Sequence, residues 1–353
     1  MSMDLNLYLR DGYCISPQHS FGETDLETLC DAVNNKLQVI EPAYTDIPTG
    51  ILRRMGRAIR FGVGTSLPLL KNYRDAINGV LIGTSNGGME DCIKFLNQIV
   101  KYEEGKLTPT NFVQSTTNAI AAQIAMLPPN RGYNTTHAHR GLAFENALLD
   151  AAMLLQETPG NKYLVGGVDE ISAYNYNIDF LDGWYKKEAV SAKDVYESGS
   201  TGALAGEGSA MFLVTDRKEE AVLRIKSIKM LHTDDAARVR EQTSAFLQKQ
   251  LSPDENIDLF LSGENGDSRY DHFYQGVSDL LNGSPIARFK HMMGEYPTAS
   301  AAGLWLAMHI LRSGKIPNHM LKNPAHKPSS LRTILIYNQH KEVQHSWMLV
   351  EKV

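Results

Sequence analysis

The sequence predicts an α/β protein in which sheets and helices form stacked layers. Short apolar segments alternate with helical segments along the whole chain, as expected when strands are connected by helices. The alternation occurs twice, before and after the charged segment DRKEE at residues 216–220. At 353 residues the chain is long enough for two halves that each have a core. We therefore expect an N-terminal half at residues 1–217 and a C-terminal half at residues 218–353.

The elements of the first half follow from periodicity and turn residues. LNLYLRDGYCIS is expected to form a strand that ends at Ser16–Pro17, and helical patterns cover residues 25–36 and 50–70. The apolar strand at residues 80–83 leads through a glycine turn into an amphipathic helix. The later expected elements are a helix at 112–126, a strand at 131–136, a long apolar helix up to residue 156, and strands within KYLVGGVDEISA and AGEGSAMFLVTD.

The second half repeats this order. Its expected elements are the strand AVLRIKSIKML, the helix DAARVREQTSAFLQKQL, the strand IDLFLSG, the helix DHFYQGVSDLLN, the helix ASAAGLWLAMHILRSG and the strands RTILIYN and HSWMLVEKV.

Composition excludes several classes of protein. A net charge of -5 without a Lys/Arg-rich run gives no electrostatic footprint for nucleic acid. No stretch approaches the length of about 18 apolar residues that a membrane span needs. The N-terminus lacks the basic and apolar regions of a signal peptide, so we expect a cytoplasmic protein. The three cysteines are far apart, which favours buried thiols over a disulfide framework or a zinc site.

Three segments contain residues that could take part in catalysis or ligand binding. His137 and His139 share a face if extended and could act as bases, but no third ligand accompanies them, so we expect no metal. IGTSNGG at residues 82–88 lacks the Lys-Ser/Thr of a phosphate loop, which favours a tight turn. Arg53, Arg57 and Arg60 are spaced to form one helix face, which is either solvated or an anchor for an acidic partner.

Several segments, in this order, resemble the β-ketoacyl-acyl carrier protein synthases of the thiolase superfamily. They are RRMGRAIRFGV, GVLIGTSNGG, NFVQSTTNAIAAQIAM, YNTTHAHRG with its following helix, YLVGGVDE, AGEGSAMFLVTD and KHMMGEYPTASAAGLWLAM. The resemblance implies a thiolase-like five-layer αβαβα fold with two similar halves, usually dimeric. We expect no cofactor.

The resemblance also implies which residues occupy the catalytic positions. The family's T-A-C-x-x-G pattern corresponds to residues 136–141, which puts Ala138 at the position of the nucleophilic cysteine; a slip of one residue would put His137 or His139 there. Gly263 or a neighbour stands where the family has its first histidine. In KHMMGE, Lys290 is kept, but Glu295 replaces the second histidine. NQHKEV at residues 338–343 replaces the family's Gly-Phe-Gly-Gly gate. Condensation needs the thiolate and both imidazoles, so it should not occur.

Two hypotheses follow. The preferred one is a pseudoenzyme of the chain-length-factor type, which forms a heterodimer with an active synthase in fatty-acid, polyketide or aryl polyene biosynthesis. An acyl carrier protein would dock on Arg53, Arg57 and Arg60, and the partner interface is expected near residues 112–126 and 131–136. The rival is an enzyme in which His137, His139 and Glu295 converge for acyl transfer or thioester hydrolysis. A homodimeric scaffold that binds the carrier without a pocket is a third possibility.

Overall fold

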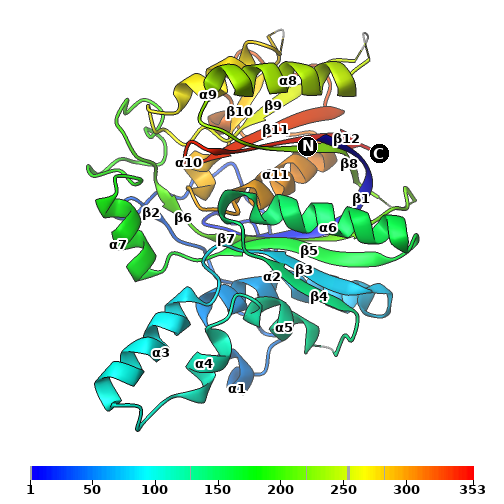
Figure 1. Ribbon diagram of the computed structural model, residues 1–353. Coiled ribbons are helices and arrows are strands. Elements are labelled where there is room, and N and C mark those ends of the chain that lie inside the picture. The colour runs from blue at the N-terminus through cyan, green and yellow to red at the C-terminus, as the bar shows by residue number, and fades with distance from the viewer. Residues whose placement is uncertain (1, 128, 220, 253–254, 282) are drawn as a thin grey trace.

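The computed structural model describes residues 2–127, 129–219, 221–252, 255–281 and 283–353. Figure 1 shows a layered molecule in which helices α6 and α11 lie between two sheets, with further helices outside each sheet. The strands of the two sheets form one hydrogen-bonded order of ten because β1 and β8 pair along part of their length. The predicted α/β class and the five-layer αβαβα arrangement implied by the resemblance are confirmed.

The two sheets have the same topology. The N-terminal order is β4-β3-β5-β7-β1 and the C-terminal order is β10-β9-β11-β12-β8. In each order the first two pairings are parallel and the last two are antiparallel. The strands are β1 Ser2–Ile15, β3 Gly79–Gly83, β4 Tyr133–His137, β5 Lys162–Asp169, β7 Gly208–Thr215, β8 Leu223–His232, β9 Leu259–Ser262, β10 Ile286–Arg288, β11 Thr333–His340 and β12 Gln344–Lys352, with β2 Lys36–Leu37 and β6 Ala205–Gly206 in a separate small sheet.

The boundary predicted between residues 217 and 218 falls in the connection from β7 to β8. Residue 220, the last of the charged segment, lies outside the described residues. Division of the chain into halves at 217/218 stays a prediction.

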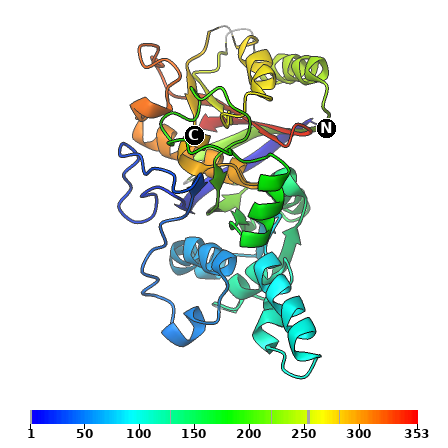
Figure 2. The same ribbon diagram turned by 90° about the vertical axis from the view of Figure 1, so that its left-hand side faces the viewer.

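Helices cover both faces of each sheet. The helices are α1 Thr49–Leu52, α2 Arg57–Tyr73, α3 Met89–Tyr102, α4 Pro109–Gln114, α5 Ala119–Ala125, α6 Ala143–Glu157, α7 Ala173–Leu181, α8 Ala236–Gln250, α9 Asp271–Ser278, α10 Lys290–Met293 and α11 Ala299–Ser313, with short 3-10 turns η1 Arg74–Ala76, η2 Arg140–Leu142 and η3 Asn318–Met320. In both views α3 and α4 lie at one end of the molecule, far from α8 and α9 (Figures 1 and 2). Among the described residues, none forms a helix with the length and apolar character that crossing a bilayer requires.

Three apolar cores hold the layers together. One core joins the two sheets through α6 and α11, a second packs α2 and α5 on the N-terminal sheet, and a third packs α8 and α9 on the C-terminal sheet. Helix α11 is buried without interruption from Ala299 to Met308. Its small residues explain how it fits between two sheets, because close packing leaves little room for larger side chains.

Three predicted helices differ from the structure. No helix forms at residues 25–36, where Asn34 and Asn35 adopt left-handed backbone conformations with φ of 52° and 58°. Residues 50–70 form α1 and α2 instead of one helix, because Gly56 is extended before the first turn of α2. The helix predicted at 112–126 is likewise divided into α4 and α5.

Candidate functional site

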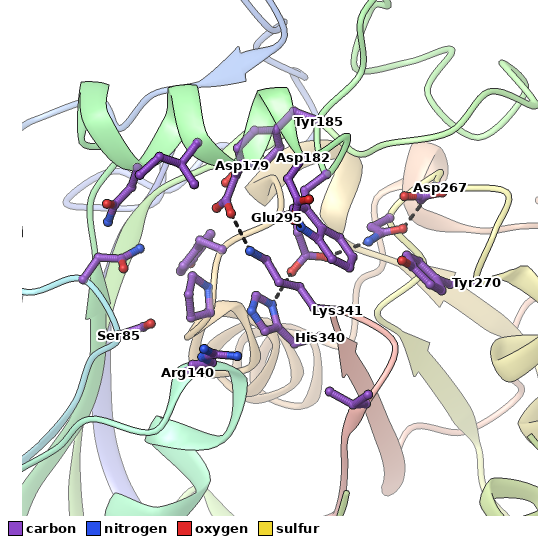
Figure 3. A pocket seen from close by; sticks show the side chains of 18 of the residues that line it. Ser85, Arg140, Asp179, Asp182, Tyr185, Asp267, Tyr270, Glu295, His340 and Lys341 are labelled. Atoms are coloured by element: carbon purple, nitrogen blue, oxygen red, sulfur yellow. Dashed lines mark hydrogen bonds and ion pairs between the residues drawn. The ribbon is translucent and has the colours of Figure 1, made fainter. Parts of the chain in front are cut away.

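A pocket of about 430 Å³ lies between the two halves (Figure 3). Its walls come from the turn after β3, from α7 and the residues that follow it, from residues 295–297 and from the hairpin between β11 and β12. Residues from both halves therefore meet at one cavity of a size typical for small-molecule sites.

The turn before α6 contributes Arg140 to the pocket. Strand β4 ends at His137, and the 3-10 turn η2 precedes the first residue of α6, Ala143. Arg140 has φ of 50° and lines the cavity, whereas Ala138 and His139 are exposed and do not line it. The Gly141 amide donates to Gln344 Oε1 at 2.8 Å. A side chain of β12 thus accepts the hydrogen bond of one of the backbone N–H groups before α6 that would otherwise lack a partner.

His137 has a structural partner outside the pocket. Its Nε2 lies 2.9 Å from Asp150 Oδ2 on α6, and the Tyr133 hydroxyl donates to the same oxygen at 3.2 Å. Of the three residues predicted to converge in the alternative enzyme, only Glu295 lines the pocket. The structure does not bring His137 or His139 to it, because His137 ends the edge strand β4 and contacts Asp150, and His139 is exposed before η2.

Glu295 is the centre of a nearly buried ionic group. Its Oε2 accepts from Lys290 Nζ at 2.6 Å and from Asn265 Nδ2 at 2.7 Å. Its Oε1 lies 3.5 Å from Nδ1 of His340, whose side chain is only 5% exposed. Burial alone raises the pKa of the Glu295 carboxyl, but Lys290 and His340 outweigh burial and lower the pKa to about 2. Glu295 is therefore a carboxylate at neutral pH.

Gly263 directly follows β9 and is packed against β11. Its amide donates to the Tyr337 carbonyl at 2.8 Å, and its own carbonyl accepts from the Tyr274 hydroxyl at 2.7 Å. A Cβ atom added to Gly263 would lie 2.7 Å from Asn338 Oδ1. An imidazole at this position would require Asn338 to move. Gly263 does not line the pocket.

Backbone amides of the glycine turn after β3 donate to the carboxylate of Asp169. Asp169 is fully buried and accepts from the amides of Ser85 and Asn86 at 2.9 and 2.8 Å. It also accepts from the hydroxyl of Thr298, which directly precedes α11, at 2.9 Å. These amides are satisfied within the chain, which agrees with the predicted tight turn and leaves no phosphate cradle.

The prediction that three arginines share one helix face is wrong. Arg53 lies in the break between α1 and α2, whereas Arg57 and Arg60 belong to α2. Arg57 pairs with buried Glu207 at 2.5 Å, and Arg60 forms two bonds of 2.9 Å to Glu41. The physical reason is that both side chains turn toward carboxylates on the molecule, so only Arg53 is exposed.

None of the residues lining the pocket is a cysteine, and burial raises the pKa of the Cys14 thiol to about 12. The described residues contain no group of three or more His, Cys, Asp and Glu side chains that could hold a metal ion.

Sequence reasoning missed several residues of this site. The sequence analysis noted residues 338–343 only because they depart from a glycine-rich pattern, and it assigned no role to His340. It also predicted neither α7 nor a role for Trp184 and Tyr185, which follow that helix. The aromatic content of residues 173–185 was the available signal. In the structure Lys341 reaches across to Asp179 of α7 at 2.5 Å (Figure 3).

Comparisons with known proteins agree with this architecture. Residues 31–242, more than half of the chain, match the family model described as "Beta-ketoacyl synthase, N-terminal domain". No curated protein sequence is a significant match.

Solved structures are similar over nearly the whole chain. A β-ketoacyl synthase from Burkholderia phymatum STM815 has a TM-score of 0.77 at 14% identity, covering 99% of this chain and 100% of that one. The ishigamide ketosynthase/chain length factor gives 0.79 at 13% identity, with coverages of 99% and 100%. A ketosynthase in complex with its chain length factor from Xenorhabdus doucetiae gives 0.77 at 14%, with coverages of 99% and 98%.

At these identities the structural likeness concerns the fold, and the family is established by the sequence match. The match covers residues 31–242, which include the turn before α6, and the likeness in fold extends over 99% of the chain. The chain belongs to the β-ketoacyl synthase family, with a thiolase-like fold.

Proposed function

We propose that this chain is a non-condensing member of its family that acts as the chain-length-factor type of partner to an active synthase. The observation that carries the proposal is the turn before α6. Arg140 lines the pocket there, Ala138 lies outside it and Gln344 holds the Gly141 amide. The pathway would be of the fatty-acid or polyketide type, aryl polyene synthesis included.

The chemistry of condensation explains why this turn matters. A thiolate at a helix N-terminus is stabilised by free backbone donors and by the partial positive charge there. Here the pocket has no thiol among its described lining residues, and one of those donors is already bonded. Glu295 places a negative charge where the family has an imidazole, which would repel a developing enolate oxygen.

Exposed apolar side chains on α4, after α5 and on β4 support assembly with a partner. Val113 is 67% exposed, Met126 59% and Tyr133 43%, and all three lie within or beside the segments predicted for the interface. Tyr133 begins β4, which is the edge strand of the N-terminal sheet. Exposed apolar side chains and an open strand edge are each typical of surfaces that another chain covers. Structures similar to this chain include a ketosynthase with its chain length factor.

Co-expression with an active β-ketoacyl synthase tests the proposal. Size-exclusion chromatography with mass measurement should give one species that contains both chains. Two separate species would count against the subunit role, and a mass equal to two copies of this chain would support the homodimeric alternative instead.

Matched substitutions locate the interface. Val113→Glu with Met126→Glu should dissociate the complex, because each buries a carboxylate in an apolar contact. Leu181→Glu is the control, because Leu181 is 82% exposed but lies on α7, away from this face (Figure 1). Loss of the complex with Leu181→Glu, and its survival with the other pair, would place the interface elsewhere.

A further inference from the structure

The pocket contains an imidazole that is backed by a carboxylate. His340 Nδ1 faces Glu295 Oε1 at 3.5 Å, and Lys290 and Asn265 fix the other carboxylate oxygen at 2.6 and 2.7 Å. The His340 side chain has no other hydrogen-bond partner among the described residues. In the tautomer that carries its proton on Nδ1, the imidazole donates to Glu295 and has its lone pair on Nε2. This is the arrangement by which a carboxylate orients a histidine that accepts protons.

Arg140 stands beside this histidine. Gly141, the next residue, packs so closely on His340 that an added Cβ atom would lie 2.8 Å from Cδ2, the carbon bonded to Nε2. Arg140 lines the same pocket, and Figure 3 shows Arg140 and His340 near each other at one side of the cavity. The Arg140 guanidinium has no acidic partner among the described residues. Arg140 and His340 therefore both line one cavity.

We propose that this pocket hydrolyses small acyl thioesters, with His340 as the general base and Arg140 as the donor to the acyl oxygen. His340 Nε2 removes a proton from water while the water oxygen bonds to the acyl carbon. The carbonyl electron pair moves to the oxygen, which Arg140 stabilises. When the intermediate collapses, the C–S bond breaks and the thiolate takes the proton from His340, giving a carboxylic acid and a thiol. Glu295 and Lys290 are positioning residues.

This inference goes beyond the subunit role and uses no residue of the proposed interface. The predicted alternative of altered acyl chemistry named His137 and His139, which the structure places outside the pocket. The chemistry is now assigned to a different histidine. Subunit assembly is measured by mass and hydrolysis by released thiol, so either can fail without the other.

The test is thiol release from S-acetyl-N-acetylcysteamine by the purified full-length chain. The wild type should exceed the buffer rate, and His340→Ala should lower kcat by about 10²–10⁴-fold, the usual contribution of a general base. Added imidazole should restore part of this loss, which a purely structural defect would not allow. Glu295→Gln should lower kcat and leave KM nearly unchanged.

Two further variants keep the proposal falsifiable if His340→Ala folds poorly. Arg140→Asn keeps a residue that tolerates positive φ and should lower kcat by about 10²-fold. His326→Ala, on an exposed loop outside the pocket, is the matched control and should match the wild type. A wild-type rate equal to buffer, with and without the synthase, would overturn the proposal. So would equal rates for wild type, His340→Ala and Arg140→Asn.

Discussion

A single buried carboxylate at the end of β5 ties the turn after β3 to the start of α11 in the other half of the chain. Asp169 at the end of β5 accepts from the turn after β3 and from Thr298, which precedes α11. Charged acceptors with several donors are worth more than neutral ones, because each backbone donor would otherwise be buried without a partner. Asp169 is therefore expected to fix the position of the pocket wall at Ser85.

Asp169→Asn should lower the free energy of unfolding by about 3 kcal/mol, because an amide NH₂ would face backbone N–H donors. Urea denaturation monitored by circular dichroism measures this change. The control is Asp46→Asn, which removes an exposed ion pair with Lys71 and should cost less than about 1 kcal/mol. Equal effects of the two substitutions would contradict the structural role of Asp169.

Glu170 is expected to make the free energy of unfolding decrease as pH rises. Burial raises the pKa of its carboxyl from 4.5 to about 7, with Arg57 opposing the shift and Glu207 adding to it. A carboxyl whose folded pKa is raised stabilises the protein fully below pH 4.5, and this contribution is lost as pH rises to about 7. Glu170→Gln should leave stability unchanged at pH 4 and increase it by about 2–3 kcal/mol at pH 8.

Denaturation of the wild type and Glu170→Gln at both pH values measures this difference. The same change at Glu157, which is exposed, should alter the unfolding free energy by less than about 0.5 kcal/mol at either pH. A destabilised Glu170→Gln at pH 8 would show that the carboxylate form is the favoured one.

The sequence was informative about individual site residues only where a local pattern existed. Ala138 and Glu295 could be singled out because each stands in a short segment of the family's pattern. The link between His340 and Glu295 could not, because 45 residues separate them and only the tertiary fold brings them together. Arg140 was hidden for a different reason: a turn of backbone with positive φ decides which of four consecutive side chains enters the pocket.

At the level of elements, the turn η2 is held by a close approach that only glycine permits. A Cβ atom at Gly141 would lie 2.3 Å from His340 Cβ and 2.6 Å from Cγ, atoms that cannot swing away. The approach seats the start of α6 against the β11–β12 hairpin.

Gly141→Ala should therefore cost about 1–3 kcal/mol of unfolding free energy, the usual range for overpacking. Gly276→Ala in α9 is the matched substitution: nothing lies within 4 Å of the added Cβ, so it should stabilise the protein by about 0.5–1 kcal/mol. Thermal denaturation of both variants tests the pair. A neutral Gly141→Ala would mean that the hairpin can move away from η2.

Periodicity predicted the long buried elements well and the irregular ones poorly. The apolar strands at 80–83 and in IDLFLSG and the helix from Ala299 were expected, because burial on both faces requires nearly continuous apolar sequence. Residues 25–36 have a helical pattern but form a loop, in which the Asp25 carboxylate accepts from the amides of Glu27 and Thr28. Such local bonds compete with a helix.

At the scale of the whole molecule, the same strand order in both sheets places α6 and α11 side by side in the centre. The pocket lies where the loops of the two halves meet, so its walls come from segments far apart in the sequence (Figures 1 and 3). The alternation of elements predicted two similar halves. It could not predict which loops would meet.

The molecule's charge distribution also decides where an acidic carrier protein would dock. Arg53 and its neighbour Arg54 are exposed beside α1, whereas Arg57 and Arg60 are held by carboxylates. Replacing Arg57 would leave Glu207 buried without its partner. A loss of carrier binding could then not be separated from a loss of stability. The exposed pair is therefore the appropriate site for a test of docking.

Arg53→Glu with Arg54→Glu should weaken binding of an acyl carrier protein to the assembled complex and reduce its dependence on salt, because exposed charges act through screened attraction. Titration by calorimetry at low and high ionic strength measures both effects. Arg238→Glu with Lys218→Glu makes the same charge change on exposed residues distant from α1 and should leave specific binding intact. If both double variants bind the carrier as the wild type does, the carrier docks on the partner synthase, and this chain contributes only its interface and its pocket.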